Sequence, residues 1–172
     1  TIHMARLMVP QATSKLCWAP SPAGEREIVP VIVSVSVGDR SGRTLTGQTL
    51  EAFYTAISHY PIMSFGLNCS LGASELMPLV EDINKWCRCA VSCYPNAGLP
   101  NEMGGYDQSP EEMAAQVRDM ASKGLVNIVG GCCGTTPDHI KAIAKALAES
   151  SSVSPKCMDE IENSSDTVNT FS

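Results

Sequence analysis

The stretch Val126-Asn127-Ile128-Val129-Gly130-Gly131-Cys132-Cys133-Gly134-Thr135-Thr136-Pro137 decides how this chain of 172 residues is interpreted. It begins with branched apolar residues, which favour a buried strand. Glycines that permit a tight turn then surround two adjacent cysteines. The closing threonine and proline suit the beginning of a helix, as N-cap and first helical residue. The stretch therefore predicts a strand, a turn that carries two thiols, and a helix.

The two thiols of this turn are expected at the carboxyl end of a strand and beside a helix N-terminus. A helix N-terminus favours negative charge and lowers the pKa of a thiol, so Cys132 and Cys133 are suited to bind a soft metal. Cys69 ends another short apolar segment, 63 residues before Cys132, or about two β-α units at roughly 30 residues each. We therefore expect all three thiols on one face of a parallel sheet. Three protein ligands leave one position open, as in catalytic zinc sites.

An apolar strand followed by an amphipathic helix occurs four times along the chain. Strands are expected at Ile28–Val37, Ile62–Gly66, Cys89–Tyr94 and Val126–Val129. Helices are expected at Gln48–His59, Ala73–Trp86, Pro110–Ser122 and Pro137–Ala148. Ser109 and Glu112 form a capping-box pattern at the third helix. The predicted fold class is α/β, either the C-terminal half of a (β/α)8 TIM-type barrel or a small open domain.

The chain divides into three parts. Residues 1–27 have no sustained periodicity and are expected to be irregular, with a short helix near Ile2–Met8. Residues 28–149 form the partial barrel domain. Residues 150–172 are rich in serine and acidic residues and are expected to be a disordered tail. A half barrel exposes strand edges, which predicts poor solubility, a partner fragment or self-association.

Composition limits the classes of partner and compartment. The net charge of −6 leaves no basic surface, which argues against nucleic acid. No apolar run is long enough to cross a membrane. Eight cysteines without a recognisable secretory signal favour a reducing compartment, and we expect a cytoplasmic protein.

Four blocks of sequence resemble one known domain family. They are Gly42–Thr49, Gly66–Cys69, Pro95–Asn101 with Gly105–Asp107, and Gly130–Pro137. In order and spacing they resemble the homocysteine-binding domain of cobalamin-dependent methionine synthase, over roughly residues 28–149. The segment Ser34–Asp39 departs from that family's pattern, and the family's first barrel half has no counterpart in residues 1–27.

The resemblance implies a (β/α)8 barrel in which Cys69, Cys132 and Cys133 hold zinc. It implies that zinc binds the thiol of homocysteine, which takes a methyl group from methylcobalamin held by a separate domain. The implied partners are homocysteine, the other barrel half, and cobalamin and folate domains. Enzymes that use S-methylmethionine or betaine share the thiol site, so the methyl donor stays open.

Other polar residues have two interpretations each. Asn68 and Asn96 lie at strand ends, where they either contact substrate or form turns. Gly104–Asp107 is either part of a lid or an ordinary turn. Cys87, Cys89 and Cys93 suggest a second metal cluster, although the alternation of Cys89 and Cys93 fits one face of a strand. His3, His59 and His139 are expected on solvated or helix surfaces and are not assigned as ligands.

The sequence thus predicts a zinc-dependent homocysteine S-methyltransferase domain of methionine biosynthesis, a methyltransferase present as a partial barrel. The alternative is a non-catalytic zinc-binding or interaction fragment of the same fold. Cys132 and Cys133 have the further alternative of core residues or a vicinal disulfide. A thiol-redox protein fits less well, because the chain lacks the Cys-x-x-Cys spacing.

Overall fold

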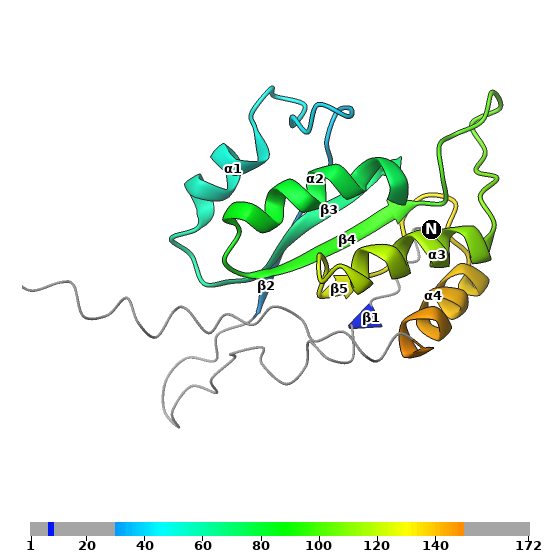
Figure 1. Ribbon diagram of the computed structural model, residues 1–172. Coiled ribbons are helices and arrows are strands. Elements are labelled where there is room, and N and C mark those ends of the chain that lie inside the picture. The colour runs from blue at the N-terminus through cyan, green and yellow to red at the C-terminus, as the bar shows by residue number, and fades with distance from the viewer. Residues whose placement is uncertain (1–6, 9–29, 150–172) are drawn as a thin grey trace, which may run out of the picture.

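The computed structural model describes residues 7–8 and 30–149 (Figure 1). Its elements are β1 (Leu7–Met8), β2 (Val31–Val35), α1 (Leu50–Ile57), β3 (Ile62–Gly72), α2 (Ala73–Trp86), β4 (Ala90–Asn96), α3 (Pro110–Ser122), β5 (Ile128–Val129) and α4 (Pro137–Glu149). Strands β2 to β5 alternate with the helices, which is the predicted succession of β-α units.

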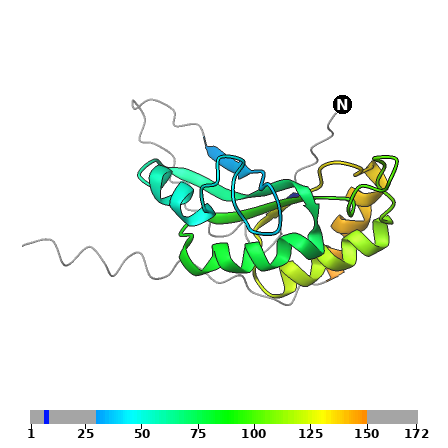
Figure 2. The same ribbon diagram turned by 90° about the horizontal axis from the view of Figure 1, so that it is seen from above.

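The five strands form one sheet in the order β1-β5-β4-β3-β2. Strands β2, β3, β4 and β5 are parallel neighbours, whereas β1 pairs with β5 in the antiparallel direction. Parallel strands in consecutive order, joined by right-handed connections, place their helices on one face of the sheet. Figure 2 shows α2 and α3 side by side on one face. This arrangement is compatible with half of a TIM-type barrel and confirms the predicted α/β class.

The hydrophobic core lies between the helices and the sheet. Phe65 of β3 is fully buried, and its ring centroid lies 5.2 Å from that of Tyr54 in α1 and 5.9 Å from that of Trp86 in α2. Because side chains alternate along a strand, the side chain of Ser64 points to the opposite face of the sheet. Helices α1 and α2 therefore pack on the face of β3 that carries the side chain of Phe65.

Helices agree with the sequence more closely than strands do. The bounds of α2 and α3 are those predicted, and the Ser109–Glu112 capping box is present at α3. By contrast, β5 is shorter than predicted because the side chain of Asn127 takes part in its pairing. Its Oδ1 accepts a hydrogen bond from the backbone N–H of Val91 at 2.8 Å. Strand β3 is longer, because pairing with β4 resumes at Gly72 after an irregularity.

The predicted helix near Ile2–Met8 is wrong at the two of its residues that are described. Leu7 and Met8 form β1, paired with Val129 and Ile128. The rest of residues 1–27, the start of the first predicted strand at Ile28, and the tail 150–172 lie outside the described residues. In the described part of the chain, no helix combines the length and apolarity that spanning a membrane requires.

Candidate metal centre

Three cysteines meet at the carboxyl ends of the parallel strands. Cys69 lies in the last part of β3, and Cys132 and Cys133 lie in the turn that follows β5. The Sγ atom of Cys133 lies 3.5 Å from that of Cys69 and 4.0 Å from that of Cys132, and all three sulfurs lie within 4.8 Å of one another. The structure thus brings together the three cysteines that the sequence singled out.

The sulfur separations fit a tetrahedral metal. A zinc–sulfur distance of about 2.3 Å with tetrahedral angles places two ligand sulfurs about 3.8 Å apart. The observed 3.5 and 4.0 Å lie on either side of that value. Among residues 30–149, this is the one group of three metal-ligating side chains close enough to share an ion.

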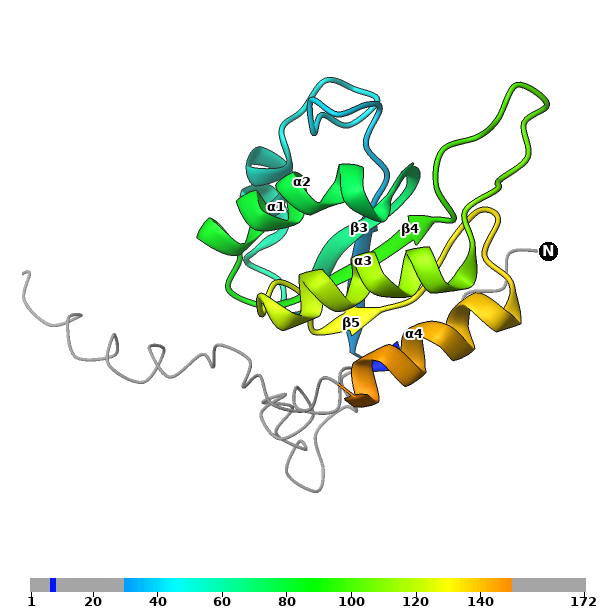
Figure 3. The same ribbon diagram turned by 45° about the vertical axis from the view of Figure 1, so that its right-hand side comes forward.

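The turn after β5 is fastened to the end of β4. The N–H of Cys132 donates to the carbonyl of Pro95 at 2.8 Å, and the N–H of Ala97 donates to the carbonyl of Cys133 at 2.9 Å. The amide oxygen of Asn96, which is 1% exposed, accepts from the N–H of Cys133 at 3.1 Å. These bonds fix the two thiols relative to the sheet. In Figure 3 the segments that follow β3, β4 and β5 gather at the same end of the molecule.

Cys69 is held in an unusual backbone conformation. Cys69 and Ser70 have φ values of 61° and 65°, the left-handed region, and they are the only such non-glycine residues in the described chain. That conformation costs a non-glycine residue roughly 1–2 kcal/mol. Such strain collects at functional sites, where surrounding structure maintains it. Here it turns the chain at the end of β3 and brings the Cys69 sulfur to the other two.

We expect the substitution Ser70→Gly to raise the free energy of unfolding by about 0.5–1 kcal/mol, because glycine adopts positive φ without the steric cost but loses more chain entropy. Urea denaturation measures the change. Ser58→Gly is the matched control, since Ser58 ends α1 with φ of −65° and should gain nothing. A loss of stability in Ser70→Gly would show that the hydroxyl of Ser70 matters more than its backbone.

The thiols of Cys69 and Cys132 have pKa values that shift in opposite directions. Burial raises the pKa of Cys69, but hydrogen bonds from the N–H of Ser70 and from the Cys133 and Cys132 thiols outweigh it and lower that pKa overall. Burial, followed by the proximity of Cys69, raises the pKa of Cys132 to about 12. Without a cation, the thiol of Cys69 therefore ionises more readily than that of Cys132. A divalent cation would let further thiols ionise.

Tyr106 is a site residue that the sequence analysis did not identify. It belongs to the loop between β4 and α3, and a Cβ at Gly134 would overlap its side chain, so the ring lies against the cysteine turn. Burial, and then the charge of Cys133, raise the pKa of its hydroxyl. From the sequence, Gly104–Asp107 was expected to be either part of a lid or an ordinary turn. The contact between Gly134 and an aromatic ring 28 positions earlier has no local signal.

The two asparagines have different surroundings. Asn68 accepts from the hydroxyl of Ser34 at 2.8 Å and donates to Ser36 at 3.2 Å, so it links β3 to the end of β2. Asn96 contacts the thiol turn directly and also lowers the pKa of Cys69 by hydrogen bonding. Of the two, Asn96 therefore lies nearer to the candidate ligands. Substrate contact by either remains a prediction.

The expectation that His139 lies on a solvated or helix surface is wrong. It is buried, with 6% exposure. Its Nδ1 accepts from the hydroxyl and the N–H of Thr136, and its Nε2 donates to the carbonyl of Gln108 at 2.9 Å. The ring thus ties the beginning of α4 to the residue before the α3 cap. In the structure His139 therefore holds two helices together. In the sequence, only its spacing of three residues from Thr136 indicated this role.

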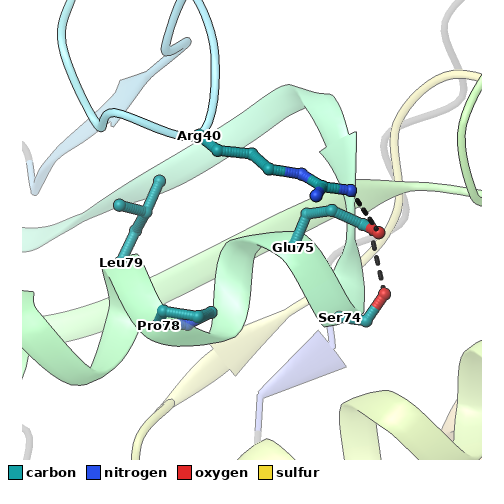
Figure 4. A pocket seen from close by; sticks show the side chains of 5 residues that line it. All are labelled: Arg40, Ser74, Glu75, Pro78 and Leu79. Carbon is teal, nitrogen blue, oxygen red and sulfur yellow. Dashed lines mark hydrogen bonds and ion pairs between the residues drawn. The ribbon is translucent and has the colours of Figure 1, made fainter.

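An open pocket of about 250 Å³ lies beside the beginning of α2 (Figure 4). It is lined by Arg40, Ser74, Glu75, Pro78 and Leu79. Arg40 and Glu75 form an ion pair of 3.4 Å across it, with the Arg40 side chain 70% exposed. An exposed pair of this kind contributes little to stability. None of the three clustered cysteines lines this pocket.

Comparison with known protein families agrees with this geometry. The family model described as homocysteine S-methyltransferase matches residues 9–147, well over half of the 172 residues. That family consists of TIM-barrel methyltransferases that take homocysteine as substrate. The three clustered cysteines and the candidate ligand turn lie within the matched region. The chain belongs to the homocysteine S-methyltransferase family.

Proposed function

We propose that this chain is a zinc-dependent domain that methylates the thiol of homocysteine, with Cys69, Cys132 and Cys133 as the zinc ligands. The observation that carries the proposal is the convergence of three sulfurs within 4.8 Å at the carboxyl ends of parallel strands. In TIM barrels that end of the sheet holds the active site. Three ligands also leave one tetrahedral position for a substrate atom.

The proposed chemistry is a direct displacement. Bound zinc supplies Lewis acidity, which stabilises a thiol as its thiolate at neutral pH. The sulfur of homocysteine then attacks the methyl carbon in line. The new S–C bond forms as the bond between carbon and donor breaks, and the donor leaves with that electron pair. Because the nucleophile is already ionised, the step needs no general base from the chain.

The chain's own residues supply position and charge. The Pro95 and Asn96 contacts hold the thiol turn in place. If Cys69, Cys132 and Cys133 hold zinc as thiolates, their negative charge would make the metal less electron-poor, so a substrate sulfur bound to it would remain nucleophilic. The side chain of Tyr106 packs against Gly134 of this turn.

We further propose methylcobalamin, carried on a separate domain, as the methyl donor, which makes this a domain of the methionine synthase type in methionine biosynthesis. The support is the likeness of Gly42–Thr49 and Pro95–Asn101 to the cobalamin-dependent member of the family. The free thiols of the described chain suit a reducing compartment such as the cytoplasm.

The test uses the zinc-loaded chain and measures two quantities, proton release on addition of homocysteine and methionine formed with methylcobalamin. Homoserine, which has a hydroxyl in place of the thiol, is the control ligand and should release no protons at neutral pH. Betaine and S-methylmethionine are run in parallel to identify the donor. Zinc binding without homocysteine-dependent proton release would favour the alternative of a non-catalytic zinc-binding fragment.

A further inference from the structure

A second pair of thiols lies far from the candidate metal centre. Cys87 ends α2 and Cys89 directly precedes β4, and their Sγ atoms lie 3.5 Å apart. The connection between α2 and β4 lies at the opposite end of the sheet from the segments after β3 and β5 (Figure 1). Both cysteines are half-buried at the margin of the core, unlike the fully buried Cys93.

A metal does not explain this pair. Among the described residues, no third histidine, cysteine or carboxylate lies close enough to share an ion with Cys87 and Cys89. Cys93, the third member of the cluster suggested by the sequence, is completely buried in the core, and burial raises its pKa to about 12. Two sulfurs alone fall short of the four ligands of a structural zinc site. Within residues 30–149, the prediction of a second metal cluster therefore has no support.

The two thiols are chemically unequal. A hydrogen bond from the Cys89 thiol lowers the pKa of Cys87 and outweighs burial, which raises it. The reciprocal hydrogen bond, together with burial, raises the pKa of Cys89. With the two sulfurs 3.5 Å apart and these opposite directions, Cys87 is assigned as the attacking thiol and Cys89 as the resolving thiol. This pairing of an attacking and a resolving thiol is what disulfide exchange requires.

We propose that Cys87 and Cys89 form a reversible intrachain disulfide by exchange with a small disulfide of the glutathione type. The Cys87 thiolate attacks one sulfur of oxidised glutathione, which forms a mixed disulfide and expels one glutathione thiolate. Cys89 then loses its proton and attacks the Cys87 sulfur, which closes the protein disulfide and expels the second glutathione. The two protein sulfurs are oxidised, and the two glutathione sulfurs are reduced.

The positive charge of Arg88 favours the reaction of these thiols with an anionic disulfide over a neutral one. Arg88 stands between the two cysteines in sequence, is exposed, and has no ion pair among those of the described residues. Its backbone N–H donates to the hydroxyl of Tyr54 at 3.0 Å, which fixes the connection while leaving the guanidinium outside. A fixed positive charge beside the thiols attracts anionic oxidised glutathione and speeds the encounter.

The test incubates the zinc-loaded full chain in glutathione buffers of increasing oxidised fraction, alkylates the free thiols, digests with trypsin and identifies the peptides by mass spectrometry. Trypsin cleaves after Arg88, so a disulfide from Cys87 joins two peptides that are otherwise separate. Cys89 and Cys93 share one of these peptides, and fragment spectra that locate the alkylated cysteine tell the two possible bonds apart. We expect this linked pair to accumulate with oxidation and to vanish on treatment with dithiothreitol. Failure to form it at any glutathione ratio would overturn the proposal, and so would a bond from Cys87 to Cys93.

Three variants sharpen the result. Cys93→Ser retains both thiols of the pair and should still form the linked peptides. Cys89→Ser should stop at the mixed disulfide, with one glutathione on Cys87. Arg88→Gln should slow the reaction with oxidised glutathione several-fold and leave the reaction with neutral hydroxyethyl disulfide nearly unchanged. If Cys89→Ser carries no glutathione on Cys87, then Cys87 is not the attacking thiol.

Discussion

Replacing Cys132 with alanine is expected to lower zinc affinity by at least about a hundredfold, because changes to residues that merely support a ligand already cost 10–100-fold. The substitution removes one of three sulfurs that lie within 4.8 Å of one another. The two remaining thiols fall short of the three protein ligands that an open zinc site has. Metal content per chain and the rise in Tm with added zinc measure the effect, since a ligand that binds the folded state alone stabilises it. Homocysteine methylation should fall below detection.

Cys89→Ser is the matched control for this experiment. It also removes one half-buried thiol from the end of a strand, but at the other end of the sheet. We expect its zinc content and zinc-dependent Tm to equal those of the unmodified chain. Equal zinc affinity in Cys132→Ala and the unmodified chain would contradict the assignment of Cys132 as a ligand.

Gly66→Ala is expected to destabilise the fold by about 3 kcal/mol or more, since overpacking a tight core site costs 1–3 kcal/mol and occasionally more. Gly66 lies in β3 opposite Ser92 of β4. A Cβ at Gly66 would overlap the carbonyl oxygen of Ser92, which is backbone and cannot rotate away. The two central strands would have to separate. Urea denaturation and the yield of soluble protein measure the effect.

Gly38→Ala is the control for this substitution. The nearest atom to a Cβ at Gly38 is the carbonyl oxygen of Arg43 at 3.7 Å, an ordinary contact. We expect the free energy of unfolding of this variant to change by no more than about 0.5 kcal/mol, as for most surface substitutions. If both variants unfold at the same urea concentration, strands β3 and β4 do not pack as closely as the structure has them.

The candidate ligands could be predicted from sequence because each lies directly after an apolar run. Parallel strands point their carboxyl ends to the same edge, so Cys69 and the Cys132–Cys133 turn had to be neighbours once the sheet was parallel. The residues that were missed depend on long-range contacts. Tyr106 reaches the site through a loop, and the buried ring of His139 donates a hydrogen bond to the carbonyl of Gln108, 31 residues earlier. No periodic pattern in the sequence indicates either contact.

The elements of the fold follow the same division. Helices α2 and α3 have the predicted bounds because their caps and apolar spacing are local. Strand ends depend on pairing partners. As a result, β3 is longer than predicted and ends at Gly72, and β5 is shorter than predicted and spans Ile128–Val129. Strand β1 was missed because two residues are too few to show an alternation.

The antiparallel strand β1 makes the two margins of the sheet unequal. Leu7 and Met8 occupy the hydrogen-bonding groups of β5 on its outer side. At the other margin, β2 pairs with β3 alone, and Val31 remains 49% exposed. Among residues 7–8 and 30–149, none pairs with the outer side of β2, so a parallel strand from another polypeptide can join there, whereas at β5 it must first displace Leu7 and Met8. We therefore expect further strands that complete a barrel to be added at β2 rather than at β5.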